Sequence, residues 1–213
     1  MGDEAPETEA LFARAAQGDC AAWGQLLTAH QERLARVVAF RMDPRLRGRV
    51  DAMDIVQEAF LEASAHRMDY FRAPSAPLFL WLRGVVSNKL LEVHRHHLGT
   101  RMRDAKRELP VDHRPSDDTR EALCAELTAH LTRPSAAAMR VEVRARLSEA
   151  LKQMDETDRE VLALRHFEQL SNAEAAQVLG IQERAAAKRY LRALERLRAI
   201  LSEMPGGLTE VRL

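Results

Sequence analysis

The sequence predicts an all-α protein: two small helical domains joined by a linker, with a helix-turn-helix in the C-terminal domain. Three observations support this fold class. Apolar residues recur at spacings of three and four along most of the chain, no segment alternates apolar and polar residues, and polar breaks containing proline separate the helical runs. Ala and Leu are abundant, and 30% of the 213 residues are charged. This composition is typical of helical domains.

The breaks divide the chain into four parts. One domain is predicted over residues 10–107 and a second over 138–204, followed by a short tail at 205–213. Residues 108–137 are polar, acidic and interrupted by prolines, which suits an interdomain linker.

In the first domain, helical spacing runs from Trp23 to Val38 and ends at Asp43-Pro44. A further helix carries Val56, Phe60 and Ala63 on its inner side and ends before a proline-rich break at 73–77. On its outer side, the carboxylates of Asp54, Glu58 and Glu62 repeat every four residues and therefore share one face. These carboxylates repel one another. A basic partner surface would relieve that repulsion, while a simply solvated face is the alternative.

After this break, Phe79 and Trp81 precede a polar and increasingly basic helix. Aromatic side chains beside basic residues can stack unpaired bases, although a core position is expected more often for both. His94, His96 and His97 are predicted to lie on a solvated, mildly basic face, because their spacing does not bring three imidazoles together on a metal.

In the second domain, two segments match the capping box, in which a hydroxyl and a carboxylate satisfy exposed backbone donors reciprocally. They are Thr157–Glu160 and Ser171–Glu174. The helix after Ser171 is expected to stop at Gly180, where glycine tolerates positive φ, and a new helix begins near Gln182. A helix, a glycine-containing turn and a second helix form the layout of a DNA-binding helix-turn-helix.

The second of these helices is predicted to separate apolar from basic residues. Its core stripe is expected to contain Ala187, Tyr190, Leu191, Leu194, Leu197 and Leu201. Its opposite arc carries Arg184, Lys188 and Arg189, placed to reach base edges in the major groove, with Arg192 and Arg196 expected at phosphates.

The overall charge conceals this arrangement, because 32 basic residues balance 32 acidic ones. Residues 94–107 contain five bases and one acid, and residues 182–198 contain six bases and two acids. Residues 108–126 contain six acids and two bases. Two basic blocks are therefore separated by an acidic stretch, which fits nucleic-acid binding better than the neutral total suggests.

Several classes are not expected. No apolar run approaches the roughly 18 residues of a membrane span, and the acidic N-terminus is unlike a secretory signal. Cys20 and Cys124 are predicted to be free thiols in the cytoplasm. No set of catalytic residues, metal ligands or cofactor-binding residues can be assembled.

Two groups of motifs together carry a family resemblance. The first comprises residues 54–61 (DIVQEAFL), Phe79, Trp81-Leu82, Asn88 and the following arginine-rich stretch. The second comprises Arg159-Glu160-Val161-Leu162, Leu170-Ser171, Glu174-Ala175-Ala176, Leu179-Gly180-Ile181 and Lys188-Arg189. In this order the groups resemble the second and fourth conserved regions of bacterial RNA polymerase sigma factors of the extracytoplasmic-function (ECF) type. Met154-Asp155 departs from the family, which commonly has Leu-Pro there.

The resemblance implies a non-enzymatic, cofactor-free initiation factor that binds core RNA polymerase, recognises promoter DNA and promotes its melting. Contacts with the β and β′ subunits would involve Asp54, Gln57, Glu58 and Leu61. The −10 element would be read by Asn88, Lys89 and Arg95, and the −35 element by Arg184, Lys188, Arg189 and Arg192. The segment from about Arg72 to Leu78 resembles the loop that captures a flipped base. An anti-sigma factor is a further implied partner.

Two other interpretations remain open from the residues. A helix-turn-helix transcriptional regulator, with a sensing or dimerising N-terminal domain, would bind duplex DNA tightly without polymerase. A helical signalling adaptor would have no DNA role and would tolerate charge reversal at Arg184 and Lys188.

Overall fold

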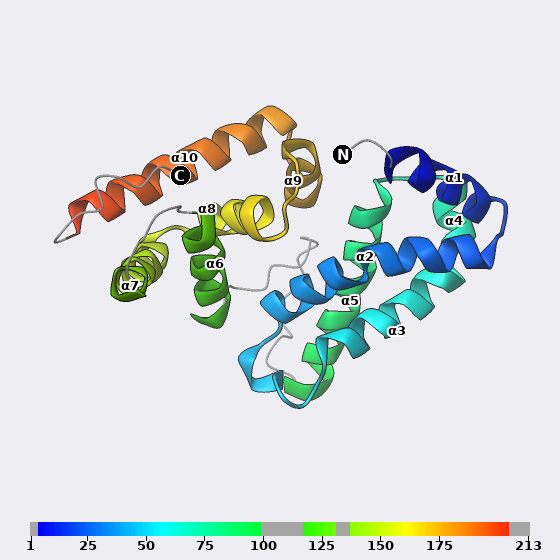
Figure 1. Cartoon of the computed structure of the whole chain (residues 1–213), viewed down its shortest axis with the longest axis horizontal. Coiled ribbons are helices and arrows are strands. Elements are labelled where there is room, and N and C mark those ends of the chain that lie inside the picture. The colour runs from blue at the N-terminus through cyan, green and yellow to red at the C-terminus, as the bar shows by residue number, and fades with distance from the viewer. Residues whose placement is uncertain (1–3, 99–116, 131–136, 205–213) are drawn as a thin grey trace. The chain divides into compact units, whose positions relative to one another are not determined.

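The computed structural model describes residues 4–98, 117–130 and 137–204, and every regular element in these ranges is helical (Figure 1). The all-α prediction is thereby confirmed. The chain forms two compact units, Met1–Val111 and Asp112–Leu213, and each is described separately below.

Unit 1 contains five α-helices and one 3₁₀ turn within its described residues. They are α1 (Glu4–Ala16), α2 (Cys20–Arg41), the turn η1 (Pro44–Leu46), α3 (Ala52–Ala65), α4 (Arg67–Arg72) and α5 (Leu78–Leu98). Helices α2, α3 and α5 pack against one another and bury Leu34, Ile55, Leu82 and Leu90 almost completely. These apolar side chains provide the main stabilisation of the unit, because their removal from water is the dominant favourable contribution to folding.

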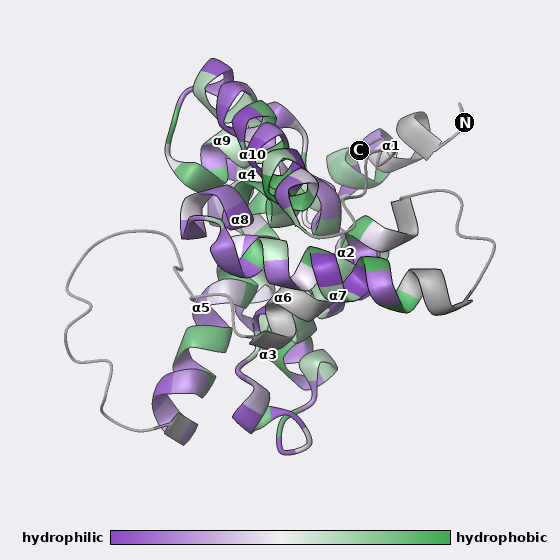
Figure 2. Cartoon of the chain, turned by 90° about the vertical axis from the view of Figure 1, so that its left-hand side faces the viewer, coloured by the Kyte–Doolittle hydropathy of each residue, from purple (hydrophilic) through white to green (hydrophobic). Residues whose placement is uncertain are grey.

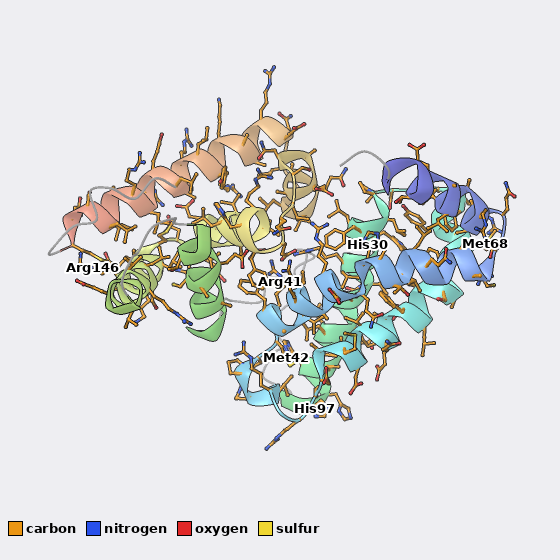
Figure 3. All side chains as sticks on the ribbon, in the orientation of Figure 1. His30, Arg41, Met42, Met68, His97 and Arg146 are labelled. Atoms are coloured by element: carbon orange, nitrogen blue, oxygen red, sulfur yellow. The ribbon has the colours of Figure 1, made fainter. Side chains whose placement is uncertain are left out.

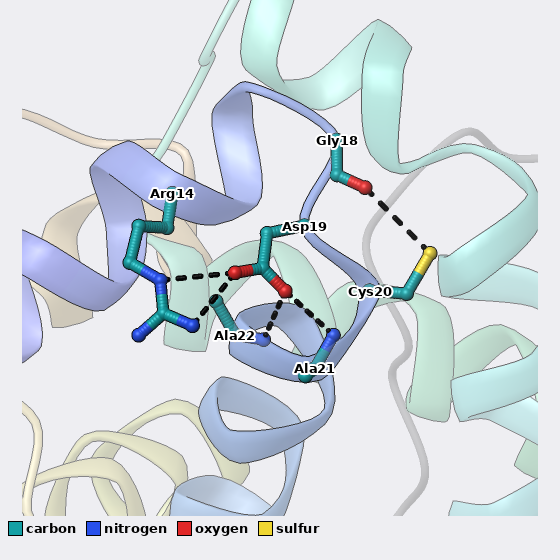
Figure 4. Close-up of polar contacts among 6 residues, drawn as sticks. All are labelled: Arg14, Gly18, Asp19, Cys20, Ala21 and Ala22. Atoms are coloured by element: carbon teal, nitrogen blue, oxygen red, sulfur yellow. Dashed lines mark hydrogen bonds and ion pairs between the residues drawn. The ribbon is translucent and has the colours of Figure 1, made fainter.

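Aspartates begin several helices of unit 1. The carboxylate of Asp19 accepts hydrogen bonds from the backbone N–H groups of Ala21 and Ala22 at 2.9 and 3.0 Å, and Arg14 pairs with the same carboxylate (Figure 4). Asp51 caps α3 by accepting from the N–H of Met53 at 2.7 Å. These bonds satisfy donors that have no partner within the helix, so the sequence marks the helix starts through its aspartates.

An aromatic cluster joins α1, α2, α4 and α5. Tyr70 stacks on Trp81 with ring centroids 4.8 Å apart, and Phe71 makes edge contacts with Phe12 and Trp23. The Trp23 indole N–H donates to Ser64 Oγ at 2.9 Å, which also ties the cluster to α3. Trp81 is half-buried, with its ring packed against this cluster.

Unit 2 is also helical. It contains α6 (Asp117–His130), α7 (Ala137–Gln153), α8 (Glu156–Leu162), the π-helical turn η2 (Ala163–Phe167), α9 (Asn172–Leu179) and α10 (Glu183–Glu203). Helix α10 packs against α7, α8 and α9.

Helix α6 lies within the segment predicted as an acidic linker. Leu123, Cys124 and Leu127 are buried on one side of it, and the helix packs against α7 and η2. Residues 108–137 are acidic and contain prolines, yet they include this short apolar stripe, whose spacing of one, three and four residues is that of a helix face.

Hydrophilic and hydrophobic residues are interleaved along the helices, as Figure 2 shows for α10. Among the described residues, no helix combines the length and the apolar character needed to cross a membrane.

Candidate nucleic-acid interface

The helix-turn-helix predicted in the second domain is formed by α9 and α10. Ser171 Oγ accepts from the Glu174 N–H at 3.2 Å, while the Glu174 carboxylate accepts from the Ser171 N–H at 2.8 Å. Gly180 ends α9 with φ +62°, and the N–H of Ile181 donates to the Ala176 carbonyl at 3.0 Å. Both the second capping box and the glycine stop are confirmed.

The other predicted capping box is wrong. Helix α8 begins at Glu156 with Asp155 as its N-cap, two residues before Thr157, and Asp155 makes no side-chain capping bond. Its carboxylate instead pairs with Arg196 of α10. A contact with a residue 41 positions away therefore replaces the local cap, which no local pattern could predict.

Helix α10 presents most of its predicted DNA-binding residues on one side. Arg184, Lys188 and Arg192 are exposed, and Arg189 is half-buried at the edge of the same surface. The opposite side buries Ala186, Ala193, Leu197 and Leu201.

The predicted core stripe of α10 is rotated from the observed one. Leu191 was expected in the core but is 57% exposed, whereas Ala186 and Ala193 are buried in its place. Small alanines allow close packing of α10 against the neighbouring helices, and large apolar side chains alone do not reveal this register. Leu191 consequently lies on the exposed side, three residues after Lys188.

Arg196 forms ion pairs within unit 2. Its Nη1 atom donates to the carboxylate of Asp158 at 2.6 Å and also pairs with Asp155. Asp158 is nearly buried, so the guanidinium compensates a carboxylate that has lost most of its hydration. Arg196 thus holds α10 against the start of α8, and its contact with a phosphate stays a prediction.

A second polar contact fastens α10 to the turn η2. Tyr190 Oη lies 3.0 Å from Nε2 of His166, and the Arg165 guanidinium carbon lies 5.3 Å from the Tyr190 ring centroid. Arg165 also donates to the Leu170 carbonyl, immediately before the capping box. These residues connect η2, before α9, directly with α10, after it. Their positioning role was not predicted from the sequence.

In unit 1, the four residues predicted at the polymerase contact share the exposed face of α3. Asp54, Gln57, Glu58 and Leu61 are all exposed, and Leu61 reaches 74%. The buried side of the helix carries Ile55, Val56, Ala59, Phe60 and Ala63. A single exposed apolar side chain is common on protein surfaces, so a polymerase contact at this face stays a prediction beside the alternative of a solvated face.

The three residues predicted at the −10 element are arranged differently on α5. Asn88 and Arg95 are exposed and lie two turns apart, so they share one face. Lys89 is only half-exposed and leans towards α3: its Nζ lies 3.0 Å from Glu92 Oε2 and 3.7 Å from Glu58 Oε2. The hydrogen bond with Glu92, aided by the charges of Glu58 and Glu62, raises the pKa of Lys89. This lysine connects the two predicted surfaces.

His94 contradicts the prediction of a solvated histidine face. Its side chain is 4% exposed, and Nε2 accepts a hydrogen bond from the Asp43 N–H at 3.2 Å. Burial lowers the pKa of His94, Arg45 adds to that shift, and Asp43 opposes it. The loop at Asp43 folds over this part of α5, which helical periodicity alone does not reveal. His96 and His97 are exposed as expected, and Figure 3 shows His97 projecting outward at the end of α5.

The remaining aromatic candidate, Phe79, is a core residue. It is 5% exposed and lies between His30 and Arg33, whose guanidinium carbon is 3.6 Å from the ring centroid. In the loop before α5, Tyr70 Oη donates to the Ala76 carbonyl at 3.1 Å and so anchors the residues between α4 and α5.

Other types of site find little support among the described residues. Their His, Cys, Asp and Glu side chains form no group of three or more that could hold a metal ion. Cys20 is an exposed free thiol and Cys124 a buried one.

Comparisons with known proteins agree with this geometry. Residues 144–197 match the family described as sigma-70, region 4. The chain is 34% identical to RNA polymerase sigma factor NccH from Alcaligenes xylosoxydans xylosoxydans over 91% of its length and 94% of the relative. It is 30% identical to RNA polymerase sigma factor CnrH from Cupriavidus metallidurans, over 90% and 92% of the two chains. A solved structure of CnrH in complex with the cytosolic domain of CnrY has 28% identity and a TM-score of 0.50, with 90% of this chain and 94% of that chain covered.

Proposed function

The chain belongs to the RNA polymerase sigma factors of the ECF type, and we propose that its two units divide the recognition of polymerase and promoter as follows. Unit 2 would read the −35 element, while unit 1 would bind core polymerase and open the −10 element. The relatives named RNA polymerase sigma factors and the match to sigma-70 region 4 favour this function over the alternatives of a ligand-sensing regulator or a signalling adaptor.

One observation carries the −35 assignment. The cationic side chains of Arg184, Lys188 and Arg192 lie on the exposed side of α10, the second helix of a helix-turn-helix, while the other side is packed in the core. The N-terminal part of such a helix enters the major groove, where Arg and Lys can donate to guanine O6 and N7. Arg189 is half-buried and lies beside them, which suits a phosphate contact better than a base contact.

The −10 element would meet the exposed face of α5. Asn88 can donate to and accept from base edges, and Arg95 can neutralise a phosphate on the same side of the helix. The loop between α4 and α5, anchored by Tyr70, is the proposed place for a base extruded from the stack.

Core polymerase would bind the exposed face of α3. Asp54 and Glu58 supply negative charge, Gln57 supplies hydrogen bonds, and Leu61 supplies apolar area at the end of the surface. A basic polymerase surface with an apolar pocket would complement this arrangement.

This function requires no cofactor and no chemistry by the factor itself, and it would be exerted in the cytoplasm, where promoter DNA is transcribed. Because CnrH has been observed in complex with the cytosolic domain of CnrY, we include an anti-sigma factor among the proposed partners.

Run-off transcription with purified core polymerase tests the proposal. The full-length chain should initiate from promoters selected out of a random library, and Arg184→Ala or Lys188→Ala should each lower −35 binding by about 1–3 kcal/mol. Glu203→Ala, at the exposed far end of α10, is the control and should leave initiation unchanged. Failure to initiate from any selected promoter contradicts the function, and equal activity of all variants contradicts the assignment to α10.

A further inference from the structure

A basic turn, residues 44–50, lies at the end of unit 1 where α5 finishes. It contains Arg45, Arg47 and Arg49 and no acidic residue, and all three arginines are exposed. We propose that the basic turn and the last turn of α5 form one surface that binds the phosphate backbone of duplex DNA next to the −10 element. This inference rests on the proposed function and adds to it a contact outside the residues predicted from the sequence.

The backbone of the basic turn is held in place by the fold. The N–H groups of Arg49 and Val50 both donate to the Leu46 carbonyl, at 2.9 and 3.1 Å. The Leu46 side chain is 1% exposed and anchors the turn in the core, while Gly48 permits the chain reversal with φ +81°. Arginines on such a turn are presented to a ligand with little backbone entropy left to lose on binding.

The basic turn lies beside the last turn of α5 (Figure 1). The Asp43 N–H, just before the basic turn, donates to His94 Nε2 at 3.2 Å, and Arg45 pairs with the Asp43 carboxylate at 2.8 Å. The next residue of α5, Arg95, is exposed on the face that we assign to the −10 element. The arginines of the basic turn therefore add positive charge at the end of that face.

The arginines of the basic turn differ in their partners within the protein. Arg45 pairs with Asp43, whereas Arg49 has no ion pair among the described residues. Arg47 donates to the neutral Ala39 carbonyl at 3.4 Å. Like charges two positions apart repel one another, and a row of phosphates would relieve this repulsion.

The surface suits paired and stacked DNA more than melted DNA. Residues 44–50 and 91–98 contain no Phe, Tyr or Trp on which unpaired bases could stack. The aromatic cluster lies towards the other end of α5, where Trp81 precedes Arg95 by fourteen positions. At 1.5 Å per residue this separation is about 21 Å, or about six base pairs of duplex. One end of α5 can therefore hold melted bases while the other holds intact duplex.

The affinity of holoenzyme for a selected promoter tests this surface, with filter binding measured over a range of salt concentrations. Arg47→Gln combined with Arg49→Gln should weaken binding several-fold. The slope of log K against log salt should become shallower by about 1.8, the contribution of two phosphate contacts with duplex DNA. Arg47→Lys combined with Arg49→Lys keeps both charges and should keep the wild-type slope.

Arg14→Gln is the matched control, because Arg14 is an exposed arginine beside the start of α2, whereas the basic turn follows the end of that helix. It removes one positive charge from unit 1 and should leave the slope unaltered. Circular dichroism would establish that all variants retain their helical content.

The inference is overturned if the double glutamine variant keeps the wild-type slope, or if Arg14→Gln lowers the slope as much per charge removed. Weaker co-purification of the double variant with core polymerase, at an unchanged slope, would assign the basic turn to a protein partner instead. A wild-type holoenzyme that binds no selected promoter contradicts the proposed function itself. A wild-type holoenzyme that binds with the slope of the double glutamine variant contradicts only the phosphate-binding surface.

Discussion

The hydroxyl of Tyr190 and Nε2 of His166 lie 3.0 Å apart and connect helix α10 with the π-helical turn η2. Tyr190 is half-buried, so its hydroxyl has exchanged part of its hydration for this contact. The contact joins η2, which precedes α9, to α10, which follows the turn at Gly180. It therefore stabilises the arrangement of the two helices in addition to the turn itself.

Tyr190→Phe removes this hydroxyl and little else. We expect a loss of about 0.5–1.5 kcal/mol in the free energy of unfolding of unit 2, the usual net contribution of one hydrogen bond. Urea denaturation of the full-length chain, followed by circular dichroism, would measure it. An unchanged midpoint would show that water replaces His166 without cost.

Arg196→Ala should lower the free energy of unfolding of unit 2 and have a smaller effect on DNA binding. Asp158 is nearly buried and would lose the guanidinium 2.6 Å away, so we expect a loss of about 1–2 kcal/mol in unfolding free energy. Arg192→Ala is the matched comparison, since Arg192 is exposed on the same helix and has no ion pair among the described residues. Arg192→Ala should leave the unfolding midpoint unchanged and weaken binding of a −35 duplex by the holoenzyme. If instead Arg192→Ala lowered the midpoint and Arg196→Ala weakened duplex binding alone, the stabilising role of Arg196 and the DNA contact of Arg192 would both be contradicted.

Asp54→Arg should abolish association with core polymerase while preserving the fold. The substitution reverses a charge at the first turn of α3 on its exposed side, where no core packing is disturbed. Co-purification with tagged core polymerase would measure the effect. Glu32→Arg, the same reversal at an exposed position of α2, should retain association. Equal recovery of both variants would exclude Asp54 from the contact.

Unit 1 should lose stability as the pH falls. Burial lowers the pKa of His94 below its ordinary value of 6.5, so below that pH the unfolded chain binds more protons than the folded one. The stabilisation is complete above pH 6.5 and decreases as the pH falls through the lowered pKa. His30 contributes in the same direction, because burial and the charge of Arg33 lower its pKa.

Urea midpoints at about pH 7 and about pH 5.5 would reveal this dependence, since the ordinary histidine pKa lies between these values. His94→Gln keeps an acceptor for the Asp43 N–H but does not titrate, so the midpoint should change less with pH. His97→Gln, at an exposed position, should retain the dependence of the wild-type chain. An identical pH response of the two variants would rule out His94 as a cause.

The sequence was most informative where structure depends on near neighbours, although the local cap predicted at Thr157–Glu160 is wrong. The Ser171–Glu174 cap, the stop at Gly180 and the exposed faces of α3 and α10 all follow from spacing within a few turns of helix. These local signals were enough to predict the fold class and to place most candidate binding residues on exposed surfaces.

The incorrect predictions involve partners distant in the chain. Asp155 pairs with Arg196, and His94 accepts a bond from Asp43, across separations of 41 and 51 residues. The prediction that Leu191 is buried was wrong for a related reason. Ala186 and Ala193 lie on the buried side of α10, and alanines contribute little to a hydrophobic pattern. For Lys89, the sequence indicated a positive charge but not that Glu58 of another helix lies beside it.

The aromatic cluster of unit 1 has a practical consequence for all these measurements. The chain contains two tryptophans, and Trp23 and Trp81 both lie in that cluster. Selective excitation of indole therefore gives an intrinsic fluorescence signal that originates in unit 1 alone. Loss of the Tyr70–Trp81 stack would change the emission as this unit unfolds, so the melting of unit 1 can be followed optically without labelling and separately from that of the helix-turn-helix.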